Sequence, residues 1–167
     1  PPLAGIGVAA TAGCAPFSMQ ANDQSSGNTT SWLWSAPGAT PNTSNAQNPS
    51  FTFDTPGTYT ITLEAGNAAG TSRDSISLSV GGIPQAQFSD AGTLGQAAVS
   101  LSNSSSSDAD SFAWDFGAGN TSSETQPAHS YAEDGDYTIT LTATNECGSD
   151  TATRQVNITT PPTAGFE

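Results

Sequence analysis

The sequence has no lysine, and Arg73 and Arg154 are its only residues with a permanent positive charge. Set against fifteen acidic residues, they leave a formal net charge of −13. Binding to nucleic acid needs a cationic face, and binding to anionic lipid needs basic residues at the surface. The composition therefore excludes a nucleic-acid partner, disfavours a lipid surface, and fits a self-repelling protein in a salt-rich medium.

Long apolar runs and helical periodicity are missing as well. No stretch is long enough to cross a membrane, and neither a signal peptide nor an initiator methionine is present. We therefore expect no membrane insertion, and we expect the chain to be a piece of something longer. Charged residues make up only 10% of the chain, and Ser, Thr, Asn and Gly are abundant. This composition favours a secreted, extracellular or cell-surface protein.

Catalytic residue types are scarce. His129 is the only histidine, and no G-x-S-x-G elbow accompanies it. One histidine and two separated cysteines cannot form a tetrahedral zinc site. The acidic residues fall in turns, where solvated carboxylates are common, so paired-carboxylate chemistry is weakly supported. We predict no catalytic residues and no enzyme, and a structural role for His129 beside Trp114.

The chain repeats itself. Residues 49–70 and 127–148 are near copies, 78 positions apart. The motif Pro-x-Ala-x-Ile/Phe begins at Pro2, Pro84 and Pro162, at steps of 82 and 78 residues. A fixed period of this size indicates tandem domains. We predict one domain at 1–82, a second at 83–161, and the start of a third repeat at 162–167.

Alternation of side chains predicts antiparallel strands. Tyr137, Ile139 and Leu141 would face a core while the intervening threonines face water, and residues 58–66 repeat this pattern. Such one-sided strands are typical of a β-sandwich. The expected strands are 3–9, 15–21, 30–35, 50–53, 58–66 and 70–80 in the first unit, and 85–90, 97–102, 110–116, 128–131, 136–144 and 150–159 in the second.

Four aromatic residues favour an immunoglobulin-like sandwich. Trp34 and Trp114 lie on the third main strand of each unit, where such folds bury an indole. Tyr59 and Tyr137 begin a long strand after a glycine turn, as a tyrosine corner does. We interpret all four as core residues. Trp32 is expected in the core too, because Phe112 takes its place in the second unit.

The second unit resembles the PKD (polycystic kidney disease) domain family. It carries Trp-Asp-Phe-Gly-Ala-Gly at 114–119, Pro-x-His-x-Tyr at 127–131, and Gly-x-Tyr-x-Ile-x-Leu-x-Ala-x-Asn-x-x-Gly at 135–148. Ala118 replaces the second Asp of the family's turn. The first unit has diverged further but matches well over 57–70. The resemblance implies an all-β fold of two tandem immunoglobulin-like, PKD-type antiparallel β-sandwiches, acting as spacer, adhesion or carbohydrate-contact modules.

The acidic loop before Trp114 is a candidate calcium site. Ca²⁺ prefers six to eight oxygen ligands, and the loop resembles the calcium-binding loop of some PKD domains. The residues concerned are Asn103, Asp108, Asp110 and Asp115. A solvated acidic loop is the simpler interpretation, since Ala118 removes one potential ligand. No other cofactor is expected.

The leading functional hypothesis is a non-catalytic structural and adhesive segment of a large secreted bacterial surface or filament protein. It would supply length, spacing and multivalent contact. Its partners would be neighbouring repeats of the same chain, copies in a homo-oligomeric filament, and a glycan or other cell-surface ligand. The alternative is a polysaccharide- or protein-binding accessory module of a secreted hydrolase.

Cys14 and Cys147 are expected to pair, as cysteines of secreted chains usually do. Cys14 would follow the first strand, at the pole of unit 1 nearest the linker. Cys147 would lie in the turn before the last strand of unit 2, at the pole where the chain enters that unit. This topology predicts an intrachain Cys14–Cys147 disulfide. The alternatives are an interchain bridge and two free buried thiols.

Overall fold

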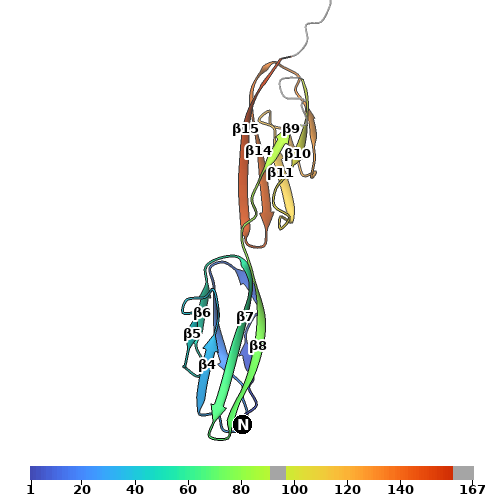
Figure 1. The fold of residues 1–167 in the computed structure, drawn as a ribbon. Coiled ribbons are helices and arrows are strands. Elements are labelled where there is room, and N and C mark those ends of the chain that lie inside the picture. Colours follow the sequence, from blue (N-terminus) through green and yellow to red (C-terminus); the bar gives the residue numbers. More distant parts are fainter. Residues whose placement is uncertain (91–96, 160–167) are drawn as a thin grey trace, which may run out of the picture. The chain divides into compact units, whose positions relative to one another are not determined.

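The computed structural model describes residues 1–90 and 97–159. It divides the chain into two compact units, Pro1–Gly82 (unit 1) and Ile83–Glu167 (unit 2). Every regular element in the described ranges is a β-strand (Figure 1). No helix of these residues is long and apolar enough to span a membrane. The predicted third repeat at 162–167 lies outside the described residues.

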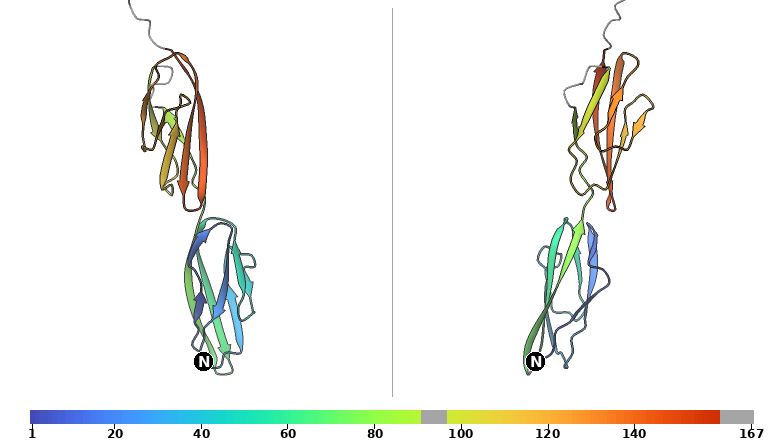
Figure 2. Two further views of the ribbon diagram at one scale, coloured as in Figure 1. Left: turned by 180° about the vertical axis from the view of Figure 1, so that it is seen from behind. Right: turned by 90° about the vertical axis from the view of Figure 1, so that its right-hand side faces the viewer.

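Unit 1 is a sandwich of two sheets, which the rotated views of Figure 2 show as two layers. The smaller sheet has the order β1-β3-β6 and the larger the order β2-β8-β7-β4-β5. All pairings are antiparallel except that of β2 with β8, which is parallel. The strands are β1 (Ile6–Val8), β2 (Ala12–Cys14), β3 (Phe17–Asp23), β4 (Ser31–Ser35), β5 (Thr43–Ser44), β6 (Ser50–Phe53), β7 (Gly57–Asn67) and β8 (Gly70–Gly81).

Unit 2 repeats this arrangement with sheets of order β13-β10-β9 and β12-β11-β14-β15. All of the pairings described for it are antiparallel. The strands are β9 (Phe88–Asp90), β10 (Ala98–Asn103), β11 (Ser111–Asp115), β12 (Thr121–Ser122), β13 (Ala128–Ser130), β14 (Gly135–Asn145) and β15 (Gly148–Ile158). The fold is therefore all-β, with two tandem immunoglobulin-like β-sandwiches.

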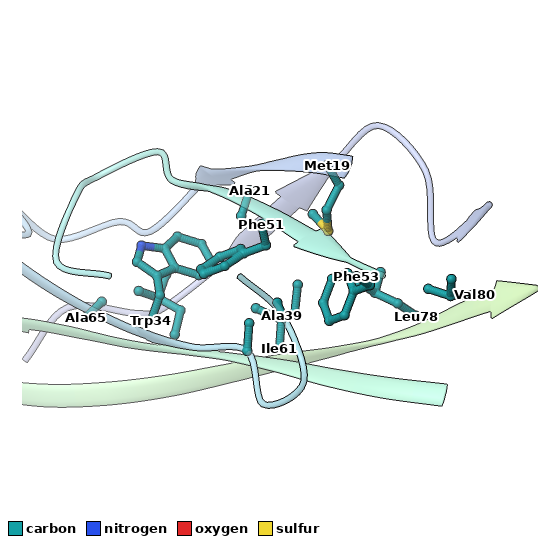
Figure 3. Packing of buried hydrophobic residues seen from close by; sticks show 12 residues of the cluster. Met19, Ala21, Trp34, Ala39, Phe51, Phe53, Ile61, Ala65, Leu78 and Val80 are labelled. Atoms are coloured by element: carbon teal, nitrogen blue, oxygen red, sulfur yellow. The ribbon is translucent and has the colours of Figure 1, made fainter. Parts of the chain in front are cut away.

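The cores follow the alternation in the sequence. In β7 the side chains of Ile61, Leu63 and Ala65 are fully buried, and each apolar side chain of Leu or Ile size contributes about 1.5–3 kcal/mol by leaving water. Figure 3 shows Trp34 and Phe51 beside each other between the sheets, with ring centroids 6.5 Å apart. The predicted burial of the threonine-free face of each long strand is thus confirmed.

The aromatic predictions are confirmed in detail. Each core indole donates its Nε1–H to a backbone carbonyl, from Trp34 to Ala46 (3.0 Å) and from Trp114 to Glu124 (2.9 Å). Each tyrosine corner closes on the fourth residue upstream. The hydroxyl of Tyr59 donates to the carbonyl of Thr55 at 2.7 Å, and that of Tyr137 to the carbonyl of Glu133 at 3.1 Å. These bonds satisfy polar atoms at the core's edge.

The strand prediction was wrong in three short elements. It assigned no strand to β2, β5 or β12, which span two or three residues each. The first strand is also shorter than the predicted 3–9. Within residues 3–5, Leu3 makes an isolated bridge to Ser26. The other contacts of this segment include hydrogen bonds to side chains; for example, the N–H of Ala4 donates to Ser72 Oγ (2.7 Å).

Candidate binding face and structural clusters

His129 belongs to a row of stacked rings in unit 2. Its imidazole lies parallel to the ring of Phe116, with centroids 4.3 Å apart, and meets Tyr131 edge-on at 4.6 Å. Nε2 is buried and has no hydrogen-bond partner. Burial lowers the pKa of His129 because the charged form loses its hydration. The predicted structural role fits this geometry, and the ring neighbours are Phe116 and Tyr131.

Asp115, at the end of β11, stabilises the turn that follows this strand. One carboxylate oxygen of Asp115 accepts the backbone N–H of Gly117 at 2.8 Å. Gly117 has φ of +77°, and a Cβ there would lie 2.7 Å from the carbonyl oxygen of Thr138, so only glycine fits. The buried hydroxyl of Tyr131 donates to the carbonyl of Phe116 at 2.9 Å and holds the turn from inside.

The serine-rich loop of the predicted calcium site forms a ladder with the start of unit 2. The N–H groups of Ser104 and Ser106 donate to the carbonyls of Gln87 and Gln85 at 2.8 and 2.9 Å. In return, the N–H of Gln85 donates to Ser106 Oγ at 2.8 Å. The hydroxyl oxygens of Ser105 and Ser106 are therefore engaged with the protein's own backbone.

The four candidate calcium ligands are dispersed. Asn103 Oδ1 accepts the N–H of Ser105 (2.9 Å), and Asp108 accepts the hydroxyl of Ser106. Asp110 precedes β11 and Asp115 ends it, so the strand separates them by roughly 16 Å. One ion cannot bind both. Within the described ranges, no three acidic, histidine or cysteine side chains are grouped to hold a metal.

Unit 1 contains a buried-edge cluster around Asp23, the counterpart of Asn103. Oδ2 of Asp23 accepts the indole N–H of Trp32 (2.7 Å) and the amide of Gln47 (3.1 Å), and Oδ1 accepts the N–H of Ser25 (2.9 Å). Burial by itself raises the pKa of Asp23. Hydrogen bonds from Ser25, Gln47 and Trp32 outweigh burial and hold that pKa below its ordinary value.

Unit 2 replaces both members of the Asp23–Trp32 pair. Asn103 stands for the carboxylate and Phe112 for the indole, so the charge-assisted bond is absent there. The buried Nδ2 of Asn103 has no partner. Trp32 and Phe112 both pack against their cores, as predicted. Sequence analysis did not find the Asp23–Trp32 bond, although the joint replacement of both residues between repeats was the available signal.

The outer face of the larger sheet is hollowed in unit 2. A shallow hollow of about 610 Å³ lies between β11, β14 and the edge strand β12. Its lining is rich in hydroxyl-bearing residues and includes Trp114, and Asp115 contributes the single carboxylate. Sequence analysis predicted that the threonines of β14 face water but did not find the hollow, which depends on where β12 pairs. The lining residues are Ala113, Trp114, Asp115, Thr121, Ser122, Ser123, Thr140 and Thr142.

The outer face of the larger sheet in unit 1 has two smaller hollows instead of one. Leu33 is 49% exposed and occupies the position of Ala113. Leu33 and Glu64 line both of two smaller hollows, of about 460 and 250 Å³. Glu64 also forms an ion pair with Arg73 (2.6 Å) across β7 and β8. The two units thus share a face but present different surfaces on it.

Both cysteines are disulfide-bonded, which confirms the predicted disulfide and rules out free thiols. In unit 1, Cys14 ends β2 directly opposite Gly81, where the chain leaves the sandwich. In unit 2, the N–H of Cys147 donates to Asn145 Oδ1 (2.9 Å) in the β14–β15 turn. Gly148 of the same turn packs against Ile83, where the chain enters.

Comparison with known proteins identifies the domains. The family model described as PKD domain matches residues 1–81 and again 83–160. A pre-pro-metalloprotease of Vibrio cholerae, PrtV, is 44% identical over 66 residues, covering 36% of this chain and 7% of that protein. A microbial collagenase of Vibrio alginolyticus is 46% identical over 46 residues, covering 27% of this chain and 6% of that protein. The chain thus spans less than a tenth of either relative.

Among solved structures, a three-immunoglobulin fragment of titin superposes with a TM-score of 0.55 at 14% identity. That match covers 98% of this chain and 67% of the titin fragment. This likeness shows the immunoglobulin-like fold alone. PKD and immunoglobulin-like domains are generally non-catalytic modules. From the family match over nearly its whole length, the chain belongs to the PKD domain family and comprises two such domains in tandem.

Proposed function

We propose that this chain is a non-catalytic structural and adhesive segment of a larger secreted bacterial protein. Its two domains add length, and the outer sheet face of each domain is available for contact with an extracellular surface. Repeating such domains along a longer chain raises the overall affinity of weak contacts through effective concentration. The disulfide supports an extracellular location, where such bonds persist.

One observation carries the proposal: the side chains that could take part in catalysis, His129 and the serines of the 103–107 loop, already hold the fold together. His129 is stacked between rings, with its Nε2 shut away from solvent. The serine-rich loop pairs with the backbone of residues 85–87. A catalytic group must reach a substrate atom, and although the half-buried ring of His129 lines a hollow of about 260 Å³, its buried Nε2 is turned toward the protein. What stays exposed is a sheet face rich in hydroxyl groups.

Two versions of this function differ in what else the protein carries. In a filament protein, many such repeats would follow one another, and copies of the chain would associate. In a secreted hydrolase, two or three repeats would stand beside a catalytic domain. The relatives, a metalloprotease and a collagenase, favour the second version. Sequencing the gene outward from both ends distinguishes them by the number of repeats and the presence of a catalytic domain.

Retention of the purified chain on insoluble material tests the adhesive function. The chain would be incubated with chitin, cellulose and collagen particles, and the bound fraction measured against serum albumin. We expect retention on at least one material and no release of soluble sugar or peptide from any of them. Absence of retention on all three would contradict adhesion, and a product released in proportion to added chain would contradict the non-catalytic role.

A further inference from the structure

We propose that the hollow on the outer sheet face of unit 2 binds a neutral polysaccharide chain. This inference rests on the proposed adhesive function and specifies which surface makes the contact. The hollow is an open depression between β11, β14 and β12, and its volume of about 610 Å³ lies within the ordinary range for ligand sites.

The lining has the hydrogen-bonding capacity that a sugar requires. Thr121, Thr140 and Thr142 each offer a hydroxyl, which both donates and accepts, whereas Ser122 Oγ already accepts the N–H of Glu124 at 3.2 Å. Asp115 uses one carboxylate oxygen to accept the N–H of Gly117, and the other oxygen can accept a sugar hydroxyl. A hydrogen bond to a charged acceptor is about twice as strong as a neutral one. The carboxylate would therefore orient the bound chain.

Charge selects a neutral occupant. Both arginines of the chain are in ion pairs, Arg73 with Glu64 (2.6 Å) and Arg154 with Asp90 (3.4 Å). An anionic glycan would meet a net charge of −13, and both arginine side chains already have a carboxylate partner. A cationic partner would be drawn to the acidic loops, since this hollow has a single carboxylate. An uncharged, hydroxyl-rich chain is complementary to the hollow and indifferent to the remaining charge.

Unit 1 provides a natural comparison within the same chain. Leu33 fills the position that Ala113 leaves open, and Glu64 replaces Thr142 and brings a carboxylate paired with Arg73. Ser35 stands where unit 2 has Asp115. Because unit 1 carries all three residues at the corresponding positions of the same fold, we expect unit 2 to fold with each of them. These exchanges give matched variants for testing the hollow.

The test is a titration of the isotope-labelled full chain followed by amide NMR. The probes are neutral cello-, laminari-, malto-, manno-, xylo- and chito-oligosaccharides, with alginate oligosaccharides as the anionic control. We expect at least one neutral probe to shift the amides of 113–115, 121–123 and 140–142, and to leave 33–35 and 62–64 unchanged. Ala113→Leu or Thr142→Glu should weaken binding at least tenfold, and Asp115→Ser about tenfold.

Three results would overturn the inference: no shift with any neutral probe, shifts centred elsewhere, or binding unaffected by Ala113→Leu. The unshifted spectrum of each variant verifies its fold. Retention on insoluble particles distinguishes a wrong assignment of the binding site from failure of the adhesive function. If Ala113→Leu is retained as well as the unaltered chain, adhesion stands and the hollow is not its site. If the unaltered chain is not retained either, the adhesive function itself fails.

Discussion

Trp32→Phe should destabilise unit 1, because it removes the indole N–H that donates to Asp23 at 2.7 Å. Hydrogen bonds to charged groups contribute about 1.5–3 kcal/mol. Two donors remain to Asp23, from Gln47 and Ser25, so the loss should fall near the lower end, at about 1–2 kcal/mol. Asp23→Asn keeps an acceptor but loses the charge, and we expect a similar cost.

The double variant measures the bond itself. If the carboxylate and the indole act as a pair, Asp23→Asn combined with Trp32→Phe should cost less than the sum of the single changes, with a coupling of about 1 kcal/mol. The double variant also reproduces the Asn103–Phe112 pair of unit 2, a combination that this fold already accepts. Urea unfolding followed by unit-specific NMR peaks gives each free energy, with unit 2 as the internal reference.

The acid dependence gives an independent check. The pKa of Asp23 is lowered in the folded state, so its ionisation stabilises unit 1 above the ordinary unfolded pKa. That stabilisation is lost as the pH falls through the folded pKa. Asp23→Asn should therefore cost more at pH 7 than at pH 2. A coupling below about 0.3 kcal/mol, or an equal cost at both pH values, would refute the assigned pair.

Three further predictions concern other clusters. Because burial lowers the pKa of His129, protonation of His129 favours the unfolded state, and the free energy of unfolding of unit 2 should fall as the pH drops from 6.5 to the folded pKa. His129→Phe, which places in unit 2 the residue found at Phe51 of unit 1, should remove this part of the pH dependence. Urea unfolding at several pH values measures it. Chelation should leave the melting temperature of both units unchanged, because β11 separates Asp110 from Asp115 and the other two candidate ligands accept hydrogen bonds from Ser105 and Ser106; a lower melting temperature of unit 2 alone would instead establish a calcium site. Non-reducing electrophoresis with peptide mapping should find the Cys14–Cys147 bridge within one chain, with an upper limit of about 4–5 kcal/mol on its contribution, and a reduction-sensitive dimer would contradict this assignment.

The sequence predicts most of this fold because its strongest signals are local and repeated. Alternation over 58–66 and 136–144 locates β7 and β14 within one residue at each end. Short strands such as β5 and β12 have no periodicity of their own, and only their backbone pairing with β4 and β11 defines them. The hollow depends on these edge strands, so it could not be predicted.

The acidic loop shows a different limit. Composition identifies oxygen ligands near Asp108 and Asp110, but coordination needs them to converge. Whether these side chains converge depends on where β11 begins and on what the serines of the loop bind. Both depend on hydrogen bonds to backbone groups far away in the sequence, at Thr144 and at residues 85–87. The exchange of Asp23 and Trp32 for Asn103 and Phe112 was visible in the repeat. Comparing the two units position by position would have indicated that contact.

The parallel pairing of β2 with β8 gives unit 1 a mechanical property. Cys14 lies opposite Gly81, the N–H of Ala15 donates to the carbonyl of Gly81 (2.9 Å), and that of Ser79 to the carbonyl of Thr11 (2.9 Å). The two strands lie near opposite ends of the unit's sequence and run the same way. While the Cys14–Cys147 bridge is intact, tension along the chain passes through it and does not load residues 15–146. Once the bridge is reduced, tension that pulls the ends of unit 1 apart slides one strand along the other and loads these bonds in shear. They must then break together, so the reduced domain should resist stretching more strongly than one whose terminal strands could be peeled apart bond by bond.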